Sequence, residues 1–414
     1  MRSSWTWVPS LFAAEEIPSA VVTFVALLMF LQTGSSSTEA IFLTSLISLP
    51  WVLKPFFRNW VSKTGHFKLI LHVIEFLLFV GLSAIAISFP FGRSWLFVAL
   101  FTVSLLCAWH QLTAQMYYER IFNPHLQRLF NGLRMFSAQT ALVMTYGVLI
   151  IVVGALEIYF RQIRPAWSMG CYILAGVFLF FVLFHMMILK NPTVGNQGWH
   201  KKRIQSLKED TRILGCIQQQ PGWWRQVVML FLLLLPQSLM FHTRVLFLID
   251  SKEAGGLGCT IQDIGFAQGT VGVIGFSLGI TLGHRLIKKY SSEHLFWQLT
   301  IMLGLSPLVY VCMTYFPPNN LGMLCVATFV AQILFGMGLN ACRILVHQIS
   351  EEQNRNSIDL LSIPIISACM IIPMAISGFL VTYLGYKTYF LIDIIMAPLG
   401  WLGAYLVSSH EEKH

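Results

Sequence analysis

The sequence predicts an all-α membrane protein with twelve transmembrane helices in two halves of six. Hydrophobic residues make up 56% of its 414 residues and charged residues only 11%, whereas soluble proteins carry about 25% charged residues. The apolar residues gather in runs long enough to cross a hydrocarbon core of ~30 Å as helices. Short basic clusters separate these runs. Composition, run length and charge placement therefore predict the same fold class.

Twelve apolar runs supply the expected spans. Their approximate limits are 7–32, 39–61, 67–89, 94–119, 133–159, 166–189, 226–249, 262–284, 294–316, 321–344, 357–384 and 388–408. The first run contains two carboxylates, and no small-residue cleavage site follows it. We therefore expect a transmembrane helix there rather than a cleaved signal peptide.

Lysine and arginine fall mainly in every second loop. The loops after the even-numbered spans carry most of them, and the loops after the odd-numbered spans carry few. By the positive-inside rule, the basic loops and both termini are expected to be cytoplasmic. These loops account for the formal net charge of +9, so we expect no nucleic-acid partner. The sequence predicts a multi-pass protein of the inner (plasma) membrane, with the lipid bilayer as its surroundings.

A long polar segment divides the chain. Residues 1–190 are expected to form an N-terminal six-helix half and 226–414 a C-terminal half, with 191–225 as a cytoplasmic linker that includes a possible amphipathic helix. Similar short basic loops follow spans 2 and 8, at corresponding places in the two halves. This layout is typical of major facilitator transporters, whose repeats pack around a midplane cavity.

Several sequence blocks resemble the muropeptide-permease-like (AmpG-type) branch of that superfamily. They are FAAEEIP (12–18), LPWVLKP (49–55), DSKEAGGLG (250–258), GTVGVIG (269–275) and ISGFLVTYLGY (376–386). The resemblance extends over nearly the whole chain. It implies twelve helices, alternating access and proton-coupled uptake of sugar-containing compounds, often cell-wall fragments.

The chain departs from this branch at acidic positions. His110, Gln111 and Gln115 occupy span 4, where relatives carry aspartates. Gln237 stands where a glutamate is common, and Glu16 stands where a glycine is usual. The chain therefore looks like a diverged member in which the coupling residues differ.

Four ionisable residues in the N-terminal half are expected at a similar depth. Glu15 should lie ~12 Å from the cytoplasmic end of span 1, level with Glu75, and His110 lies ~13 Å in from the same face. Buried carboxylates and imidazoles take up and release protons, so Glu15 or Glu16 with Glu75 and His110 form a candidate proton site. The alternatives are structural: Glu75 pairs with His72 within its own helix, and His110 joins neighbouring helices.

Two further residues are candidates for gating. Pro18 should loosen the backbone of span 1, as a gating helix would require, although prolines are also common in passive spans. Lys54 lies near the inner end of span 2, where it either snorkels to the headgroups or pairs with an acidic residue at the inner mouth. Gln111 and Gln115 are expected to line the substrate or proton pathway beside these residues.

Span 7 carries the candidate polar residues of the C-terminal half: Gln237, His242 and Arg244. Arg244 near the outer end either snorkels, pairs with Asp393 or binds an anionic group of the substrate.

The leading hypothesis is a secondary transporter for a small sugar-containing or muropeptide-like solute and protons. The alternatives are an exporter of amphipathic drugs or lipids, a siderophore permease, and a non-transporting receptor. No P-loop or metalloprotease motif occurs, and the eight cysteines form no CxxC pair. We therefore expect no enzyme activity, no cofactor and no metal, and we expect a monomer.

Overall fold

The computed structural model describes residues 4–54, 61, 66–190, 223–290, 292–351 and 355–411. Side chains are described throughout these ranges except at 223–226, 292–294, 345–351, 355–363 and 402–411. Every regular element in the described ranges is a helix. The expected amphipathic helix falls in residues 191–222, outside the described chain.

Ten helices are long and apolar enough to cross a membrane, counted within the described residues. Two further features bring this number to the expected twelve. A shorter apolar helix runs from Ser37 to Val52. The last long helix contains a break at Gly385, where φ is 72° and ψ is 159°. Since that backbone conformation favours glycine, the break separates two spans between the expected limits 384 and 388.

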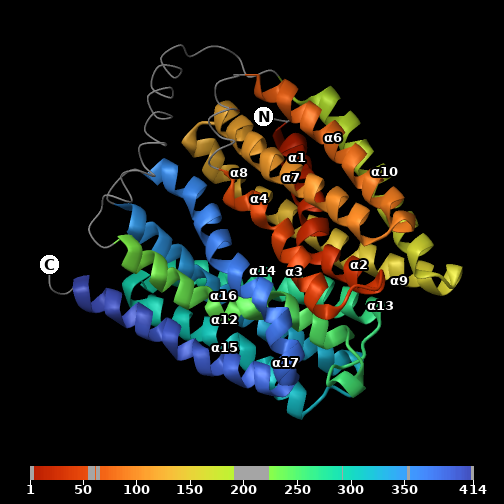
Figure 1. The fold of residues 1–414 in the computed structure, drawn as a ribbon. Coiled ribbons are helices and arrows are strands. Elements are labelled where there is room, and N and C mark those ends of the chain that lie inside the picture. Colours follow the sequence, from red (N-terminus) through yellow and green to blue (C-terminus); the bar gives the residue numbers. More distant parts are fainter. Residues whose placement is uncertain are drawn as a thin grey trace. The chain divides into compact units, whose positions relative to one another are not determined.

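The chain divides into two compact units (Figure 1). The first unit comprises Met1–Ser35 and Ile47–Arg212. Its elements are α1 (Ser4–Ala20), η1 (Val21–Val25), α2 (Ala26–Gln32), α4 (Leu49–Val52), α6 (Phe67–Ser88), η2 (Phe89–Phe91), α7 (Arg93–Ile121), α8 (Pro124–Leu142), η3 (Val143–Val148), α9 (Leu149–Phe160) and α10 (Ile163–Ile188). Within it, α6 packs against both α7 and α10, and α1 packs against α7, α8 and α10.

The second unit comprises Ser36–Leu46 and Ile213–His414. Its elements are α3 (Ser37–Ile47), α12 (Trp223–Ile249), η4 (Lys252–Ala254), α13 (Ile261–Ile264), η5 (Gly265–Gly272), α14 (Val273–Tyr290), α15 (Ser292–Tyr315), α16 (Leu321–Glu351) and α17 (Arg355–Glu411). Here α12 packs along α17, and α16 packs against α14 and α15. An apolar core lies between α12, α15, α16 and α17, around Leu230, Leu303 and Phe335.

Helix α3 packs with the second unit although it lies early in the chain. The Thr38 hydroxyl donates to the Gly378 carbonyl at 3.3 Å and lies 3.0 Å from the Thr382 hydroxyl of α17. A Cβ at Gly378 would lie 3.0 Å from the Thr38 Cα, so the absence of a side chain lets these helices approach. The domain limits at 190 and 226 stay a prediction.

The backbone of the first span changes its hydrogen-bonding pattern just after Pro18. Proline has no N–H to donate to the carbonyl one turn earlier, and the chain passes from α1 into the π-helical turn η1 at Val21. The Thr23 hydroxyl bonds the Ser19 carbonyl at 2.7 Å, which satisfies one acceptor in this region. The backbone of span 1 is therefore irregular next to Glu15 and Glu16. Two further π-helical turns, η3 and η5, interrupt spans 5 and 8.

The loop from Asp250 to Gly258 follows α12 and folds back on it. Gly255 and Gly258 have positive φ values of 84° and 67°, and a Cβ at Gly256 would collide with the Asp250 backbone. The Asp250 carboxylate accepts a hydrogen bond of 2.6 Å from the Tyr386 hydroxyl of α17. Burial raises the pKa of Asp250, and this hydrogen bond partly opposes the shift. The glycines of this block thus have a structural role.

Candidate functional site: buried polar clusters in the two units

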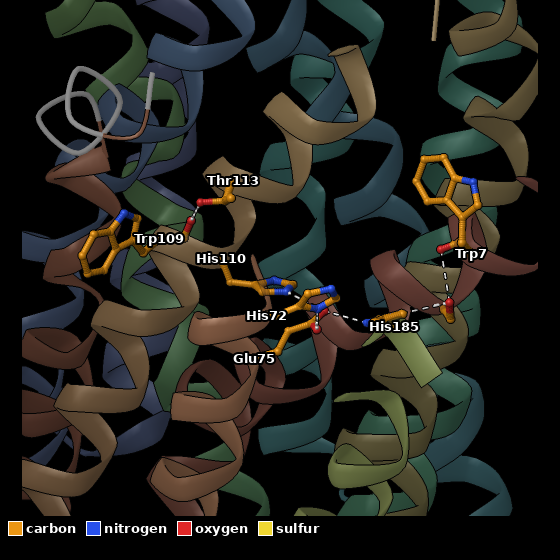
Figure 2. A network of polar contacts seen from close by, with 8 residues as sticks. Trp7, His72, Glu75, Trp109, His110, Thr113 and His185 are labelled. Atoms are coloured by element: carbon orange, nitrogen blue, oxygen red, sulfur yellow. Dashed lines mark hydrogen bonds and ion pairs between the residues drawn. The ribbon is translucent and has the colours of Figure 1, made fainter. Parts of the chain in front are cut away.

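A carboxylate and three histidines meet inside the first unit (Figure 2). Glu75 of α6 is fully buried. Its Oε1 lies 2.6 Å from His185 Nδ1 of α10 and 3.4 Å from His110 Nε2 of α7. Its Oε2 lies 3.6 Å from His72 Nδ1, one turn earlier on α6. We call these four residues the histidine–carboxylate cluster. It joins the consecutive helices α6 and α7 to α10, which lies later in the chain.

The cluster reaches α1 through His185. His185 Nε2 lies 3.0 Å from the Ser10 hydroxyl, and that hydroxyl donates to the Trp7 carbonyl at 3.1 Å. A hydroxyl has one hydrogen to donate, so Ser10 accepts from His185 Nε2–H in this arrangement. His185 Nδ1 then faces a carboxylate oxygen at 2.6 Å, and a proton must lie between them because two acceptors repel. The separation therefore fits one proton shared between Glu75 Oε1 and His185 Nδ1.

Gln111 of α7 connects a second set of side chains in the first unit. Its Oε1 accepts hydrogen bonds from Trp51 Nε1 at 3.0 Å and from Lys54 Nζ. Its Nε2 donates to the Ser19 hydroxyl of α1 at 3.3 Å. Lys54 is buried, so its ammonium points into the protein instead of snorkelling. Gln111 thus ties α1, α7 and the end of span 2 together.

The adjacent carboxylates of α1 lie near these groups. Glu15 is buried and its Oε2 has no hydrogen-bond partner, whereas Glu16 is partly exposed. Glu15 interacts electrostatically with Lys54, His110 and Arg134. Each buried charge at membrane depth costs roughly 2.5–3.5 kcal/mol on insertion scales, and the opposite charges nearby offset part of this. Glu15, Glu75 and His110, which were expected at one depth, do lie close together.

Arg134 of α8 was missed as a site residue by sequence analysis. It was not singled out because it stands at the expected start of span 5 at 133. Helix α8 instead begins at Pro124, capped by Asn123, whose Oδ1 accepts from Leu126 N at 2.9 Å. The Asn-Pro pair is a helix-start signal in the sequence. This correction moves Arg134 into the third turn of a helix.

The Arg134 side chain extends the polar site of the first unit. Its Nη1 donates to Gln115 Oε1 at 2.6 Å, and Gln115 Nε2 donates to Glu119 Oε1 at 2.6 Å. Its guanidinium lies 4.2 Å from the centroid of the Phe12 ring, one turn from Glu16 on α1. Gln115 therefore connects the Arg134 guanidinium to the Glu119 carboxylate through two hydrogen bonds.

In the second unit, the candidate residues of α12 take different positions. Gln237 donates to the Leu303 carbonyl of α15 at 2.7 Å, which makes it a tie between two helices. His242 and Arg244 are both buried, and His242 Nε2 and Arg244 Nε lack hydrogen-bond partners. The Gln237 side chain therefore has a hydrogen-bond partner in the protein, whereas these nitrogens of His242 and Arg244 do not.

Arg244 lies among aromatic and amide side chains. Its guanidinium carbon is 5.3 Å from the centroid of the Phe241 ring and 5.7 Å from that of Phe335. At such distances each cation–π contact contributes about 0.5–1 kcal/mol, and a central arginine costs roughly 2.5–3.5 kcal/mol on insertion scales. Although Arg244 lies near the C-terminal end of α12, its side chain is packed inside the protein and only 7% exposed.

Three neutral side chains near Arg244 are linked to one another by hydrogen bonds. Gln268 Nε2 of η5 donates to the Tyr310 hydroxyl of α15 at 3.0 Å, and Gln332 Nε2 of α16 donates to Gln268 Oε1 at 3.3 Å. Tyr310 interacts electrostatically with Arg244. We call the set His242, Arg244, Gln268, Tyr310 and Gln332 the arginine cluster.

Asp393 of α17 does not neutralise Arg244. Its carboxylate is buried, and neither oxygen has a hydrogen-bond partner. The structure records no ion pair between these two described residues, so the pairing that the sequence suggested is absent. Both charged groups remain without a counter-ion in the described part of the second unit.

Sequence analysis also missed His185, Tyr310 and Gln332. His185 is a lone histidine in an apolar run near the expected cytoplasmic end of span 6, and the same feature in span 4 had drawn attention to His110. Tyr310 and Gln332 carry no local signal, since isolated polar residues in spans are common interhelical contacts. Among the described residues, no group of histidine, cysteine or acidic side chains is arranged to hold a metal ion.

Solved structures that are similar to this chain include transporters. The nucleoside transporter NupG has a TM-score of 0.66 at 15% identity, covering 98% of this chain and 98% of that chain. A bacterial homologue of the human lysosomal transporter Spinster, inward-facing and occupied, has a TM-score of 0.70 at 13% identity, covering 97% and 96%. The inward-open xylose transporter XylE from E. coli has a TM-score of 0.62 at 10% identity, covering 96% and 95%.

No protein-family model matches the sequence, and no curated protein matches it. At identities of 10–15% the structural likeness establishes the fold alone. The likeness covers nearly the full length of each chain, as the layout of spans predicted. This multi-pass membrane protein has the fold of the major facilitator transporters.

Proposed function

We propose that this protein is a proton-coupled secondary transporter that imports a small sugar-containing or cell-wall-derived solute across the inner membrane by alternating access. The fold and the sequence blocks that resemble muropeptide permeases support this function. The ionisable side chains inside the spans also support it, because burying them at membrane depth is costly and such residues usually serve a function. The same proposal places both termini in the cytoplasm and takes the transporting unit to be a monomer.

The observation that carries proton coupling is the buried contact of 2.6 Å between Glu75 Oε1 and His185 Nδ1. The pair is fully buried, and its 2.6 Å separation requires one proton between two acceptor atoms. Adding a second proton yields a neutral carboxylic acid beside an imidazolium. Removing the first leaves a carboxylate facing a lone pair. Loading and unloading this site therefore changes how α6 and α10 are held together.

The first span provides a route from the proton to a conformational change. α1 is bonded at Ser10 to His185 and at Ser19 to Gln111. Between these points lie Glu15 and Glu16, and after them the backbone enters the π-helical turn η1. A change in protonation alters the hydrogen bonds of α1 at an irregular point of its backbone, where π-turns are common at functional sites. Lys54 adjusts the balance of charge beside both carboxylates.

Reconstitution into liposomes tests this function. An inward proton gradient is applied with N-acetylglucosamine, glucose, D-glucuronate and D-glucose 6-phosphate as labelled probes, so that neutral and anionic sugars are both present, and solute uptake and internal pH are recorded together. We expect at least one probe to accumulate with internal acidification in the wild type, and we expect Glu15→Gln and Glu75→Gln to abolish gradient-driven accumulation while remaining folded. His125→Asn, which changes an exposed histidine of α8, is the control.

Other outcomes separate the alternatives. Binding without accumulation would favour the receptor, and accumulation only under an outward-directed gradient would favour the exporter. If both Glu15→Gln and Glu16→Gln accumulate the probe at the wild-type level, the acidic pair of α1 has no part in proton coupling.

A further inference from the structure

The second unit contains a buried cation that nothing in the described chain neutralises. Arg244 is more than nine-tenths buried, its Nε lacks a hydrogen-bond partner, and no ion pair reaches it from a described acidic residue. Buried charges in proteins are normally paired. The two phenylalanine rings beside it offset only part of the cost. An anionic partner from outside the chain would complete this environment.

We propose that Arg244 binds an anionic oxygen group, a carboxylate or a phosphate, of the transported solute. A guanidinium presents N–H groups in a planar fork that matches two oxygens at once, and Nε–H, an edge donor of that fork, is free. This inference rests on the proposed transport function and names the chemical class of its substrate.

The rest of the arginine cluster suits a polyhydroxylated solute. Gln268, Tyr310 and Gln332 come from three different helices and are linked by hydrogen bonds of 3.0 Å and 3.3 Å. Amides and hydroxyls both donate and accept, so they fit the hydroxyl groups of a sugar without adding charge. Phe241 and Phe335 present apolar ring faces to the same guanidinium. The combination points to a sugar acid or a sugar phosphate rather than a neutral sugar.

Matched probes test the proposal on the full chain. Thermal stabilisation of the purified protein is titrated with D-glucuronate, D-galacturonate and D-glucose 6-phosphate, each compared with its neutral parent sugar, and with D-glucosamine as the cationic probe. Bound ligand stabilises in proportion to ln(1 + [L]/Kd), so each series yields an affinity. We expect an anionic probe to bind at least tenfold more tightly than its parent, and the uronate and phosphate arms identify which group is preferred.

Variants at Arg244 locate the effect. Arg244→Gln should remove the preference for the anionic probe, and Arg244→Lys should weaken it about tenfold because the planar fork is lost. Arg285→Gln, an exposed arginine of α14 in the same unit, should keep the wild-type affinity. The melting temperature of each variant without probe shows whether it is folded. If Arg244→Gln does not fold, Arg244→Lys is used alone to test the preference for the anionic probe.

The proposal is overturned if no anionic probe stabilises the wild type, if neutral parents bind equally well, or if Arg244→Lys and Arg244→Gln keep the wild-type preference. Its failure is distinct from failure of the transport function. Proton-driven accumulation of a neutral sugar alone would refute the anion site and leave transport standing. Anion binding that depends on Arg244, without accumulation in liposomes, would support the anion site and refute the transport function.

Discussion

The two units bury ionisable side chains in opposite ways. In the first unit Glu75 has no exposed surface, and its carboxylate contacts His185, His110 and His72. In the second unit Arg244 and Asp393 are buried about as deeply, and the described chain gives neither of them a counter-ion. Removing one partner of a buried pair is costly, whereas an isolated buried charge is already costly in the native state. In the first unit Glu75 is paired with side chains of the same unit, whereas in the second unit we propose that Arg244 is paired with an anionic group of the solute.

This difference assigns distinct roles to the two clusters in the proposed cycle. The histidine–carboxylate cluster can gain or lose a proton and still keep contacts among its own members, so it can act without the solute. The arginine cluster changes its charge balance only when something binds. Coupling then requires that both events act on one conformational equilibrium, as linkage demands.

The largest effect is expected from Glu75→Gln. The substitution keeps the shape but removes the charged acceptor that faces His185 and His110, and hydrogen bonds to charged groups contribute about 1.5–3 kcal/mol. Gradient-driven accumulation should fall to the level of empty liposomes, while exchange of solute at equal pH continues. Uptake and exchange assays in parallel check this. A variant that still accumulates solute would show that the cluster is only a structural joint between helices.

Lys54→Met should have the next largest effect. It removes the donor to Gln111 and leaves Glu15 and Glu16 with less compensating charge, at a cost of about 1–3 kcal/mol for the unpaired buried groups. We expect a lower melting temperature and a reduced gradient-driven uptake, and a loss of about 1.4 kcal/mol would lower the ratio of folded to unfolded protein tenfold. Recovery in the double variant Lys54→Met/Glu15→Gln would confirm that the two charges interact, and unchanged single-variant stability would contradict it.

Tyr386→Phe examines Asp250, a carboxylate of the second unit that accepts a hydrogen bond from the Tyr386 hydroxyl. Burial raises the pKa of Asp250 and the Tyr386 hydroxyl lowers it, so the variant raises this pKa further. When the pKa of an acid is higher in the folded protein than in the unfolded chain, the folded protein loses stability as the pH rises above the unfolded pKa. The loss of stability, about 1–2 kcal/mol for this hydrogen bond, should therefore be larger at pH 7 than at pH 3.5.

Thermal unfolding at the two pH values measures the difference. Tyr389→Phe is the matched control, because the Tyr389 hydroxyl donates to the neutral Leu239 carbonyl at 2.9 Å, and its cost should not change with pH. Equal losses for Tyr386→Phe at both pH values would show that Asp250 does not ionise differently in the folded protein.

Asp393→Asn should have the smallest effect on stability. The carboxylate has no hydrogen-bond partner to lose, and the amide removes the cost of burying a charge, so the change in unfolding free energy should be about zero or slightly stabilising. The contrast with Glu75→Gln, measured in the same thermal assay, is the sharpest test of the comparison. A large destabilisation would reveal that Asp393 does have an important partner.

Particular residues show how far the sequence could be interpreted. Apolar run lengths placed the spans within a few residues, except at α8, where the expected start at 133 ignored the Asn123-Pro124 signal. Position along the helices brought Glu75 and His110 to the same depth, and the structure places them 3.4 Å apart. Pairing of Arg244 with Asp393, one of three alternatives from the sequence, is not found among the described residues. The choice could not be made earlier, because rotation of each helix about its axis cannot be derived from periodicity when nearly every face is apolar.

The sequence by itself determined the membrane class, the number of spans and the layout of the fold, because the hydrocarbon thickness imposes a local length on every helix. It also marked Glu15, Glu75 and His110 as unusual, since charge inside an apolar run is visible without a partner. Only the tertiary structure decided which groups meet. Glu75 finds His185 110 residues further along the chain, and Arg134 reaches Gln115 from another helix. Such contacts depend on how helices pack and rotate against one another, which is a property of the assembled bundle and not of any single segment.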